Sequence, residues 1–284
     1  MILVTGANGN LGSETIQKLR QKNPGLPVAG FVRSEEKGAG LKKLGVEIRI
    51  GDYLDVDSVK KVLHGVDTLL LISSSTLEKR VEQHKNVIDA AGQSGVQHIF
   101  YTSMLRAEKL LSPLNPDHYE TEKLLKASGI PFTIHRHTFY TEFFPAILGN
   151  AAETGQWHFP GAGKAMNFAY RKEMAEALAI NLAESSKHQN KTFEITSAKA
   201  FTFQEYARMV GEACGKTISY KDLTVDEYIN QLKEAGLPAH VVELGEVSAK
   251  TIVNGALDFT SGDLEMVLGR KPKSTADFIK EYFS

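Results

Sequence analysis

The chain opens with Met1-Ile-Leu-Val-Thr-Gly-Ala-Asn-Gly-Asn-Leu-Gly12, and this stretch decides the fold. The apolar run at its start predicts a short strand, and the glycines at 6, 9 and 12 predict a tight turn that leads into a helix. Glycine permits such a turn and lets the backbone approach a pyrophosphate, while the following helix presents unpaired N–H groups. The spacing is a variant of the better known Gly-x-Gly-x-x-Gly pattern. The stretch therefore predicts a dinucleotide site made by Gly6, Asn8, Gly9, Asn10, Leu11 and Gly12.

The same unit of strand and helix recurs along the first half of the chain. Strand-like runs lie at 2–4, 28–32, 46–50, 68–72, 98–101 and 132–135. Helix-like segments lie between them, at 11–22, 35–44, 57–63, 77–93 and 117–128. Strands that alternate with helices imply a parallel sheet with right-handed crossovers. We therefore predict an α/β fold with a Rossmann-type, doubly wound parallel sheet. Asp55 is expected to cap a helix, and Gly65, Gly95 and Gly129 are expected to end helices.

The alternation weakens after Pro145, which predicts a second part of the chain. Residues 153–163 are expected to be loop-rich, whereas a helix over 172–185 and a strand over 192–195 are expected to return to the sheet. Helical patterns dominate afterwards, at 203–214, 225–235, 240–254, 261–268 and 275–282. The predicted division is a dinucleotide-binding domain over 1–150, joined by 170–198. A smaller, mainly helical C-terminal lobe over 151–169 and 199–284 would lie on the substrate side.

Composition excludes several classes of protein. The 284 residues carry 33 basic and 34 acidic side chains, so neither a nucleic-acid nor a membrane-surface footprint is expected. No leader and no apolar run of membrane-spanning length is recognised, and the cytoplasm is the expected compartment.

Two short motifs do not match the ligand sites they resemble. His135 and His137 alternate without a carboxylate or cysteine at ligand spacing, so no metal site is expected. Gly161-Ala-Gly163-Lys164 lacks the first glycine and the final Ser or Thr of a phosphate loop. The sequence is compatible with a homodimer and does not determine the oligomeric state.

The residues that follow the second strand bear on the choice of dinucleotide. Arg33 ends that strand, and Ser34 and Lys37 come next. An acidic residue at this position would bind the ribose 2′-hydroxyl of NAD, whereas arginine suits a 2′-phosphate. We therefore expect NADP(H) to be preferred over NAD(H). The alternative is that Arg33 lies in solvent and pairs with Glu35 or Glu36.

Two further strand ends supply candidate cofactor contacts. After the third strand, Asp52 could accept a hydrogen bond from the adenine amino group beside Tyr53, or it could cap the next helix. After the fourth strand, Ser73, Ser74 and Ser75 are small enough for a ribose and pyrophosphate to lie across the backbone. A plain loop of capping serines is the alternative for these three.

The fifth strand ends at Tyr101-Thr102-Ser103, and Tyr119 and Lys123 follow four residues apart on one helical face. Ser103, Tyr119 and Lys123 resemble the Ser…Tyr-x-x-x-Lys set of short-chain dehydrogenases and reductases. In that chemistry the lysine lowers the tyrosine pKa and holds the nicotinamide ribose, and the tyrosine exchanges a proton with the substrate. Tyr-x-x-x-Lys alone carries little information, and Tyr119 could equally be a surface tyrosine.

Several segments together narrow the resemblance. They are Val4–Gly12, Arg33, Gly51-Asp-Tyr53, Leu71-Ile-Ser-Ser-Ser75, His98–Ser103 and Glu120-Thr-Glu-Lys123. Over essentially its full length the chain is similar to the NmrA-like atypical branch, and within it to bacterial NAD(P)H:quinone oxidoreductases and triphenylmethane reductases. This resemblance implies NADPH binding and reduction of quinones or cationic dyes without flavin or metal. It also implies that Tyr101, Thr102, Lys123 and Tyr140 lie near the nicotinamide. Branch members often lack a tyrosine at the place of Tyr119, because a quinone accepts hydride readily and solvent can supply the proton.

An aromatic stretch follows the sixth strand. The candidate substrate residues are Phe139, Tyr140, Phe143, Phe144 and, further along, Trp157. Aromatic walls would suit a flat conjugated acceptor stacked beside the nicotinamide. The alternative is that these side chains are ordinary core.

The leading hypothesis is an NADPH-dependent oxidoreductase that passes hydride directly to a quinone-like acceptor, with catalysis by proximity and orientation. A second hypothesis is a redox-sensing regulator that binds NADP(H) without turnover, because a fold alone does not specify function. A third, a sugar-nucleotide epimerase or reductase, would require a polar pocket, and the aromatic stretch argues against it.

Overall fold

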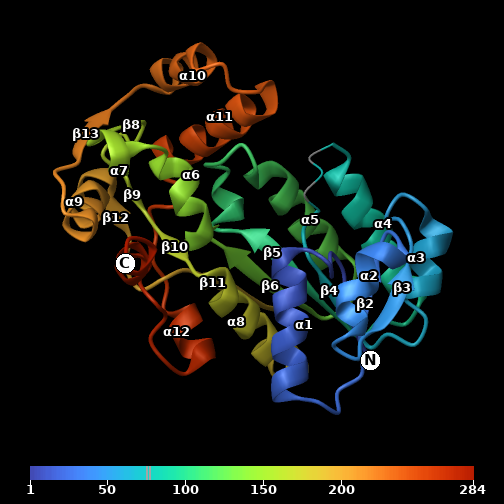
Figure 1. Ribbon diagram of the computed structural model, residues 1–284. Coiled ribbons are helices and arrows are strands. Elements are labelled where there is room, and N and C mark those ends of the chain that lie inside the picture. The colour runs from blue at the N-terminus through green and yellow to red at the C-terminus, as the bar shows by residue number, and fades with distance from the viewer. Residues whose placement is uncertain (75, 77) are drawn as a thin grey trace. The chain divides into compact units, whose positions relative to one another are not determined.

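The computed structural model describes residues 1–284 except 75 and 77 (Figure 1). By its internal contacts the chain divides into two compact units. Unit 1 comprises Met1–Met104, Asp117–His137 and Lys172–Phe193, and unit 2 comprises Leu105–Pro116, Thr138–Arg171 and Glu194–Ser284. The predicted boundary at residue 150 lies beyond His137, where the chain passes from unit 1 into unit 2.

Unit 1 is built on the seven-stranded sheet, whose order is β11-β6-β5-β4-β1-β2-β3. Its strands are β1 Ile2–Val4, β2 Val28–Val32, β3 Glu47–Ile50, β4 Thr68–Leu71, β5 His98–Met104, β6 Phe132–His137 and β11 Lys191–Ile195. The pairs among β1 to β6 are all parallel, and the order reverses between β1 and β4. Such a reversal is where ligands bind in open α/β sheets. The doubly wound, Rossmann-type prediction is confirmed, including the return of a late strand to the sheet.

Helices cover both faces of this sheet. They are α1 Asn10–Lys22, α2 Glu35–Lys42, α3 Val56–Val62, α4 Arg80–Gln93, α5 Asn115–Ala127, α8 Arg171–Ala183 and the short η3 Ser185–His188. The core of one face joins Val59, Val87 and Leu125, from α3, α4 and α5, to the strands. Burying each such side chain contributes about 1.5–3 kcal/mol. Helices α1 and α8 lie side by side (Figure 1), joined by a Lys22–Glu176 ion pair of 2.9 Å.

The predicted helix ends are confirmed. The Asp55 carboxylate accepts a hydrogen bond from the Ser58 N–H at 3.2 Å and so caps α3. Gly65, Gly95 and Gly129 have φ angles of +70°, +77° and +74°. This left-handed conformation suits glycine, because it has no Cβ to clash.

Unit 2 combines helices with short strand pairs. Its helices are η1 Ala107–Lys109, η2 Thr141–Phe143, α6 Phe144–Leu148, α7 Ala151–Thr154, α9 Phe203–Cys214, α10 Val225–Glu234, α11 Ala239–Val253, α12 Asp263–Leu268 and α13 Thr275–Tyr282. Its strands are β7 Phe139–Tyr140, β8 Gln156–Phe159, β9 Ala165–Met166, β10 Phe168–Ala169, β12 Phe201–Thr202 and β13 Ser219–Asp222. They pair as β7 with β10, β9 with β12, and β8 with β13. The late helices are as predicted.

The segment 153–163, predicted to be loop-rich, contains the strand β8, which the sequence analysis did not identify. That strand pairs in parallel with β13, and its residues alternate between exposed and buried from Gln156 to Phe159. Alternation is the mark of a strand with one face buried. Four residues beside glycine and proline gave too short a pattern to be recognised.

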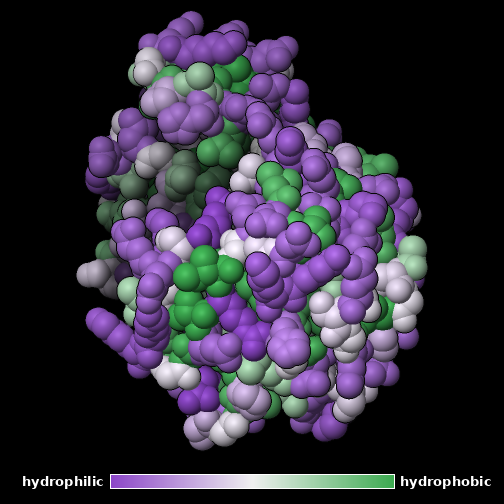
Figure 2. All heavy atoms as spheres, turned by 90° about the vertical axis from the view of Figure 1, so that its right-hand side faces the viewer, coloured by the Kyte–Doolittle hydropathy of each residue, from purple (hydrophilic) through white to green (hydrophobic). Residues whose placement is uncertain are grey.

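The face of the molecule on the side of α2 and α3 is mostly hydrophilic, with apolar residues scattered across it (Figure 2). Among the described residues of unit 1, the exposed large apolar side chains are Ile50, Leu54 and Val56, near the carboxyl end of β3. Within the described ranges, no helix combines the length and the apolar character needed to cross a bilayer.

Candidate functional site

The glycine turn after β1 has the geometry of an anion-binding helix start. The Gly9 N–H donates to the Gly6 carbonyl at 2.9 Å, and Gly6 has a φ of +55°. A Cβ on Gly12 would stand 2.4 Å from the Gly6 carbonyl oxygen, so no larger residue fits there. Helix α1 begins at Asn10 with neither a side-chain cap nor an acidic residue in its first turn. Its leading N–H groups and its positive dipole end therefore suit a pyrophosphate.

Arg33 lies at the carboxyl end of β2 and is exposed. Ser34 caps α2 by accepting a hydrogen bond from the Lys37 N–H at 3.4 Å. Glu35 pairs with Lys42 at 2.5 Å, and no ion pair joins Arg33 to a carboxylate in the part of the chain that the structure describes. The exposed position of Arg33 agrees with the alternative of a solvated residue, whereas its pairing with Glu35 or Glu36 is not seen among the described residues.

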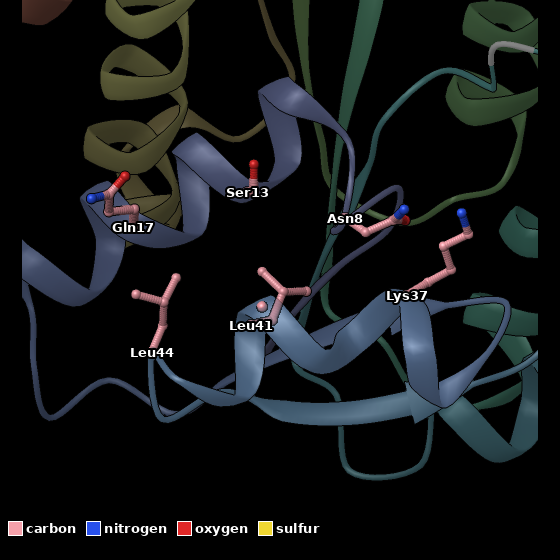
Figure 3. Close-up of a pocket in the computed structure, with 7 residues that line it drawn as sticks. Asn8, Ser13, Gln17, Lys37, Leu41 and Leu44 are labelled. Atoms are coloured by element: carbon pink, nitrogen blue, oxygen red, sulfur yellow. The ribbon is translucent and has the colours of Figure 1, made fainter.

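A pocket of about 300 Å³ lies between α1 and α2, beside the glycine turn. Asn8 and Lys37 line one end of it, and Gln17 and Leu44 line the other (Figure 3). The Lys37 ammonium makes the end nearest the glycine turn positive. The sequence had marked Lys37 only as a neighbour of Arg33, and the pocket shows that it shares a wall with Asn8.

Asp52 and Tyr53 lie in the turn that follows β3. The Asp52 carboxylate accepts from the Leu54 N–H at 2.8 Å and so shapes the turn, whereas Asp55 caps the next helix. The Tyr53 ring packs edge-on against Phe31, with centroids 5.1 Å apart. Desolvation raises the pKa of Tyr53 to about 12, partly opposed by hydrogen bonding to Thr5 and to the Gly6 backbone. Tyr53 therefore lies against the glycine turn.

The ends of β4 and β5 are joined through side chains. The Thr102 hydroxyl accepts a hydrogen bond from the Ser73 N–H at 2.9 Å. Ser74 is buried, and Ser75 lies outside the described residues. Tyr101 is fully buried, and its phenol is 2.9 Å from Nδ1 of His118 on α5. Its ring therefore packs into unit 1, and Thr102 holds the loop that follows β4.

Tyr119 and Lys123 share one face of α5, as their spacing predicts. The Lys123 ammonium lies 5.5 Å from the centroid of the Tyr119 ring. Lys123 is exposed and pairs with Glu120, and that hydrogen bond raises the pKa of Lys123.

Ser103 instead meets the buried face of α5. Its hydroxyl donates to Glu122 Oε1 at 2.7 Å, and Arg136 on β6 binds both oxygens of the same carboxylate, at 2.8 and 2.7 Å. In the described residues, no hydrogen bond joins Ser103 to Tyr119. Ser103 on β5 thus contacts the buried face of α5, whereas Tyr119 and Lys123 share another face of that helix, and the catalytic roles of the three residues stay predictions.

The candidate substrate residues also differ in placement. In unit 2, Phe139 and Tyr140 are half-buried, and Phe143 is 38% exposed. Phe144 and Trp157 are core residues with ring centroids 5.8 Å apart, and the Trp157 indole donates to the Ile147 carbonyl at 3.0 Å. For Phe144 and Trp157 the structure supports the core alternative. The other three keep ring surface that a ligand could meet.

The Gly161–Lys164 segment is occupied by the protein's own carboxylate. The N–H groups of Gly161 and Ala162 both donate to Asp222 Oδ1, at 2.8 and 3.1 Å. A loop that already binds a carboxylate does not offer those N–H groups to a phosphate. This agrees with the sequence-based rejection of a phosphate loop.

The sequence analysis did not identify several buried polar side chains whose hydrogen bonds connect the strand ends with α4 and α5. They are Thr5, Arg80, His84, His118, Thr121, Glu122 and Arg136. Arg80 and His84 stand four residues apart at the start of α4, directly after the serine loop, and this spacing was the one available signal. Their partners lie on other elements and are brought near only by the fold.

The NmrA-like family model matches residues 1–275. The chain belongs to the NmrA-like family. Quinone oxidoreductase 2 of Escherichia coli is 33% identical over 284 residues, which cover 100% of this chain and 99% of that protein. The crystal structure of the E. coli NADPH-dependent quinone oxidoreductase complexed with NADPH matches with a TM-score of 0.94, 32% identity and full coverage of both chains. The Citrobacter sp. triphenylmethane reductase complexed with NADP(H) matches with a TM-score of 0.92, 34% identity and 99% coverage of both chains.

Proposed function

We propose that this NmrA-like protein is an NADPH-dependent oxidoreductase that reduces a quinone-like or other conjugated acceptor without flavin or metal. The observation that carries the proposal is the uncapped start of α1 beside Gly12, where a Cβ would stand 2.4 Å from a backbone carbonyl oxygen. The full-length similarity to E. coli quinone oxidoreductase 2 and to Citrobacter triphenylmethane reductase supplies the class of reaction.

In this proposal each strand end binds one part of the dinucleotide. The N–H groups of Asn10, Leu11 and Gly12 bind the pyrophosphate, and Arg33 and Lys37 bind the 2′-phosphate. Asp52 and Tyr53 lie on the adenine side, and Ser73 and Ser74 lie along the ribose and pyrophosphate. Lys123 binds the nicotinamide ribose once it turns from Glu120.

Bound NADPH supplies the hydride, and the protein's part is to bind and orient the two reactants. A quinone carbonyl takes its proton from solvent, so the reaction does not depend on the Tyr119 phenol. In unit 2, Phe139, Tyr140 and Phe143 keep ring surface suited to a flat acceptor.

Arg33→Ala is expected to weaken NADPH binding by about tenfold or more and to leave NADH binding unchanged. The reason is that a charge-assisted hydrogen bond to the 2′-phosphate is lost, and NADH has no such group. Dissociation constants for both dinucleotides, measured by fluorescence titration, test this. Glu36→Ala, on the same exposed turn, is the matched control and should leave the preference intact. An unchanged ratio of the two constants in Arg33→Ala would show that Arg33 is not the 2′-phosphate contact.

The function itself is tested by following NADPH oxidation by the purified protein. The acceptors are small benzoquinones, naphthoquinones and a triphenylmethane dye, with NADH in parallel. Turnover well above the uncatalysed rate, and faster with NADPH, is the expected result. Tight NADPH binding with no turnover on any acceptor would overturn the proposal in favour of a dinucleotide-sensing regulator.

A further inference from the structure

The backbone of the loop after β4 is held by side chains. The Ile72 N–H donates to the Thr5 hydroxyl at 2.9 Å, and the Ser73 N–H donates to the Thr102 hydroxyl at 2.9 Å. Thr5 directly follows β1 and Thr102 lies on β5, so the two hydroxyls extend the hydrogen bonding on both sides of β4 beyond its last paired residue. The loop therefore leaves the sheet in a defined path.

At Ser74 both backbone groups are bound from the first turns of α4. The Ser74 N–H donates to Nε2 of His84 at 3.0 Å, and the Ser74 carbonyl accepts from Nε of Arg80 at 2.9 Å. Both side chains are buried, His84 completely and Arg80 with 6% exposed. The N–H and the carbonyl of Ser74 belong to two successive peptide groups, and α4 binds one group of each, so this helix fixes the orientation of the backbone at Ser74.

The hydrogen bonds around His84 are consistent with a single tautomer. Because Nε2 accepts from Ser74, Nδ1 carries the proton and donates to the Thr121 hydroxyl at 2.9 Å. That hydroxyl in turn donates to the Asp117 carbonyl at 2.8 Å. The chain of bonds runs from the loop after β4 to α5, the helix that carries Lys123.

The surroundings keep His84 neutral, which its acceptor role requires. Burial, and then the positive charge of Arg80, lower the pKa of His84 to about 3. Tyr101 from β5 packs edge-on against the imidazole, with ring centroids 5.5 Å apart. His118 on α5 is also held neutral by burial, and Asp117 pairs with Arg80 at 3.7 Å.

We infer that His84, together with Arg80, is a positioning residue that fixes the Ser73–Ser74 backbone for the dinucleotide and ties this loop to α5. The inference rests on the proposed function, because it takes the loop after β4 as a cofactor contact. It predicts that loss of the imidazole weakens NADPH binding more than its effect on folding alone would explain. A histidine that served only the core would affect stability and leave the dissociation constant for NADPH unchanged.

The test measures the dissociation constant for NADPH by fluorescence titration, together with the thermal midpoint of the protein without cofactor. His84→Leu leaves the Ser74 N–H without its acceptor and is expected to raise the dissociation constant about tenfold. His84→Gln should stay within about threefold of wild type, because its amide can accept from Ser74 and donate to Thr121.

His98→Leu is the matched control. His98 is also buried, and its Nε2 is 2.8 Å from the Thr133 hydroxyl, but it stands at the start of β5. We expect it to lower the thermal midpoint and to leave NADPH binding unchanged. If His84→Leu does not fold, Thr121→Val decides, with an expected rise of about threefold from the lost bond to Nδ1.

Three results would contradict either the inference or the proposed function, and the experiment distinguishes between these two cases. An unchanged dissociation constant in His84→Leu, or in Thr121→Val where that variant decides, would overturn the inference. An equal weakening in His98→Leu would do the same, because it would show a general effect of destabilisation. Wild-type protein that did not bind NADPH would overturn the proposed function itself.

Discussion

Replacing Glu122 with leucine is expected to lower the free energy of unfolding by about 3 kcal/mol or more. Glu122 is completely buried on α5, and its carboxylate accepts hydrogen bonds from Ser103 and from two nitrogens of Arg136. Leucine would remove the negative charge and leave the buried guanidinium of Arg136 short of two hydrogen bonds. Breaking a buried ion pair from one side is costly, because the remaining charge stays desolvated.

Urea unfolding followed by far-UV circular dichroism measures this effect. Lys126→Ala is the matched control, because Lys126 lies 3.6 Å from the same carboxylate but is 43% exposed. An exposed partner contributes little, so the control should change stability by less than about 1 kcal/mol. Adding Arg136→Met to Glu122→Leu should recover part of the loss, since the buried guanidinium charge is then gone. A loss in Glu122→Leu no greater than that of Lys126→Ala would contradict the prediction.

The sheet of unit 1 could be predicted because its strands are short, apolar and separated by clear turn residues. Strands buried on both faces read as continuous apolar runs, and Val28–Val32 is buried at every position. The helix caps were equally local: Asp55 and the glycines at 65, 95 and 129 act within a few residues of their own positions. Local signals of this kind need no knowledge of the fold.

The site could be predicted only where one residue's chemistry and position were sufficient. The positions of the glycine turn and of Arg33 follow from strand ends alone, and their contacts with a cofactor stay predictions. The Tyr119–Lys123 pair shares a helix face as its spacing requires. Which face of α5 turns inward depends on partners from β5 and β6, so the sequence could not show that Ser103 meets Glu122. Phe144 and Trp157 were ambiguous for a similar reason, because an aromatic run does not reveal which rings face the core.

Mild acid is expected to destabilise the protein strongly, through histidines buried in unit 1. Burial is the main cause that lowers the pKa of His84, His118 and His137 to about 3, and it lowers that of His135 well below its ordinary range. In the unfolded chain each would titrate near its ordinary value of about 6.5. Below that pH the histidines bind protons in the unfolded state but stay neutral in the folded state. The free energy of unfolding therefore falls as pH falls below about 6.5, and it is retained at higher pH.

The size of this effect follows from the difference between the two pKa values. At pH 5 each histidine with a folded pKa of about 3 lowers the free energy of unfolding by about 2 kcal/mol. Three of them together remove about 6 kcal/mol, which is comparable with the typical total of about 5–15 kcal/mol. We therefore expect unfolding without denaturant somewhere near pH 4–5, whereas stability between about pH 7 and 8 should be nearly constant.

Urea titrations at pH 7.5 and pH 5, read by far-UV circular dichroism, test the prediction. His84→Gln provides the internal control, because glutamine does not titrate but can keep the bonds to Ser74 and Thr121. The difference in unfolding free energy between the two pH values should therefore be about 2 kcal/mol smaller in this variant. Equal stability of the wild-type protein at the two pH values would mean that these histidines are not held neutral in the folded state. A difference that His84→Gln leaves unchanged would mean that His84 is not among the groups responsible.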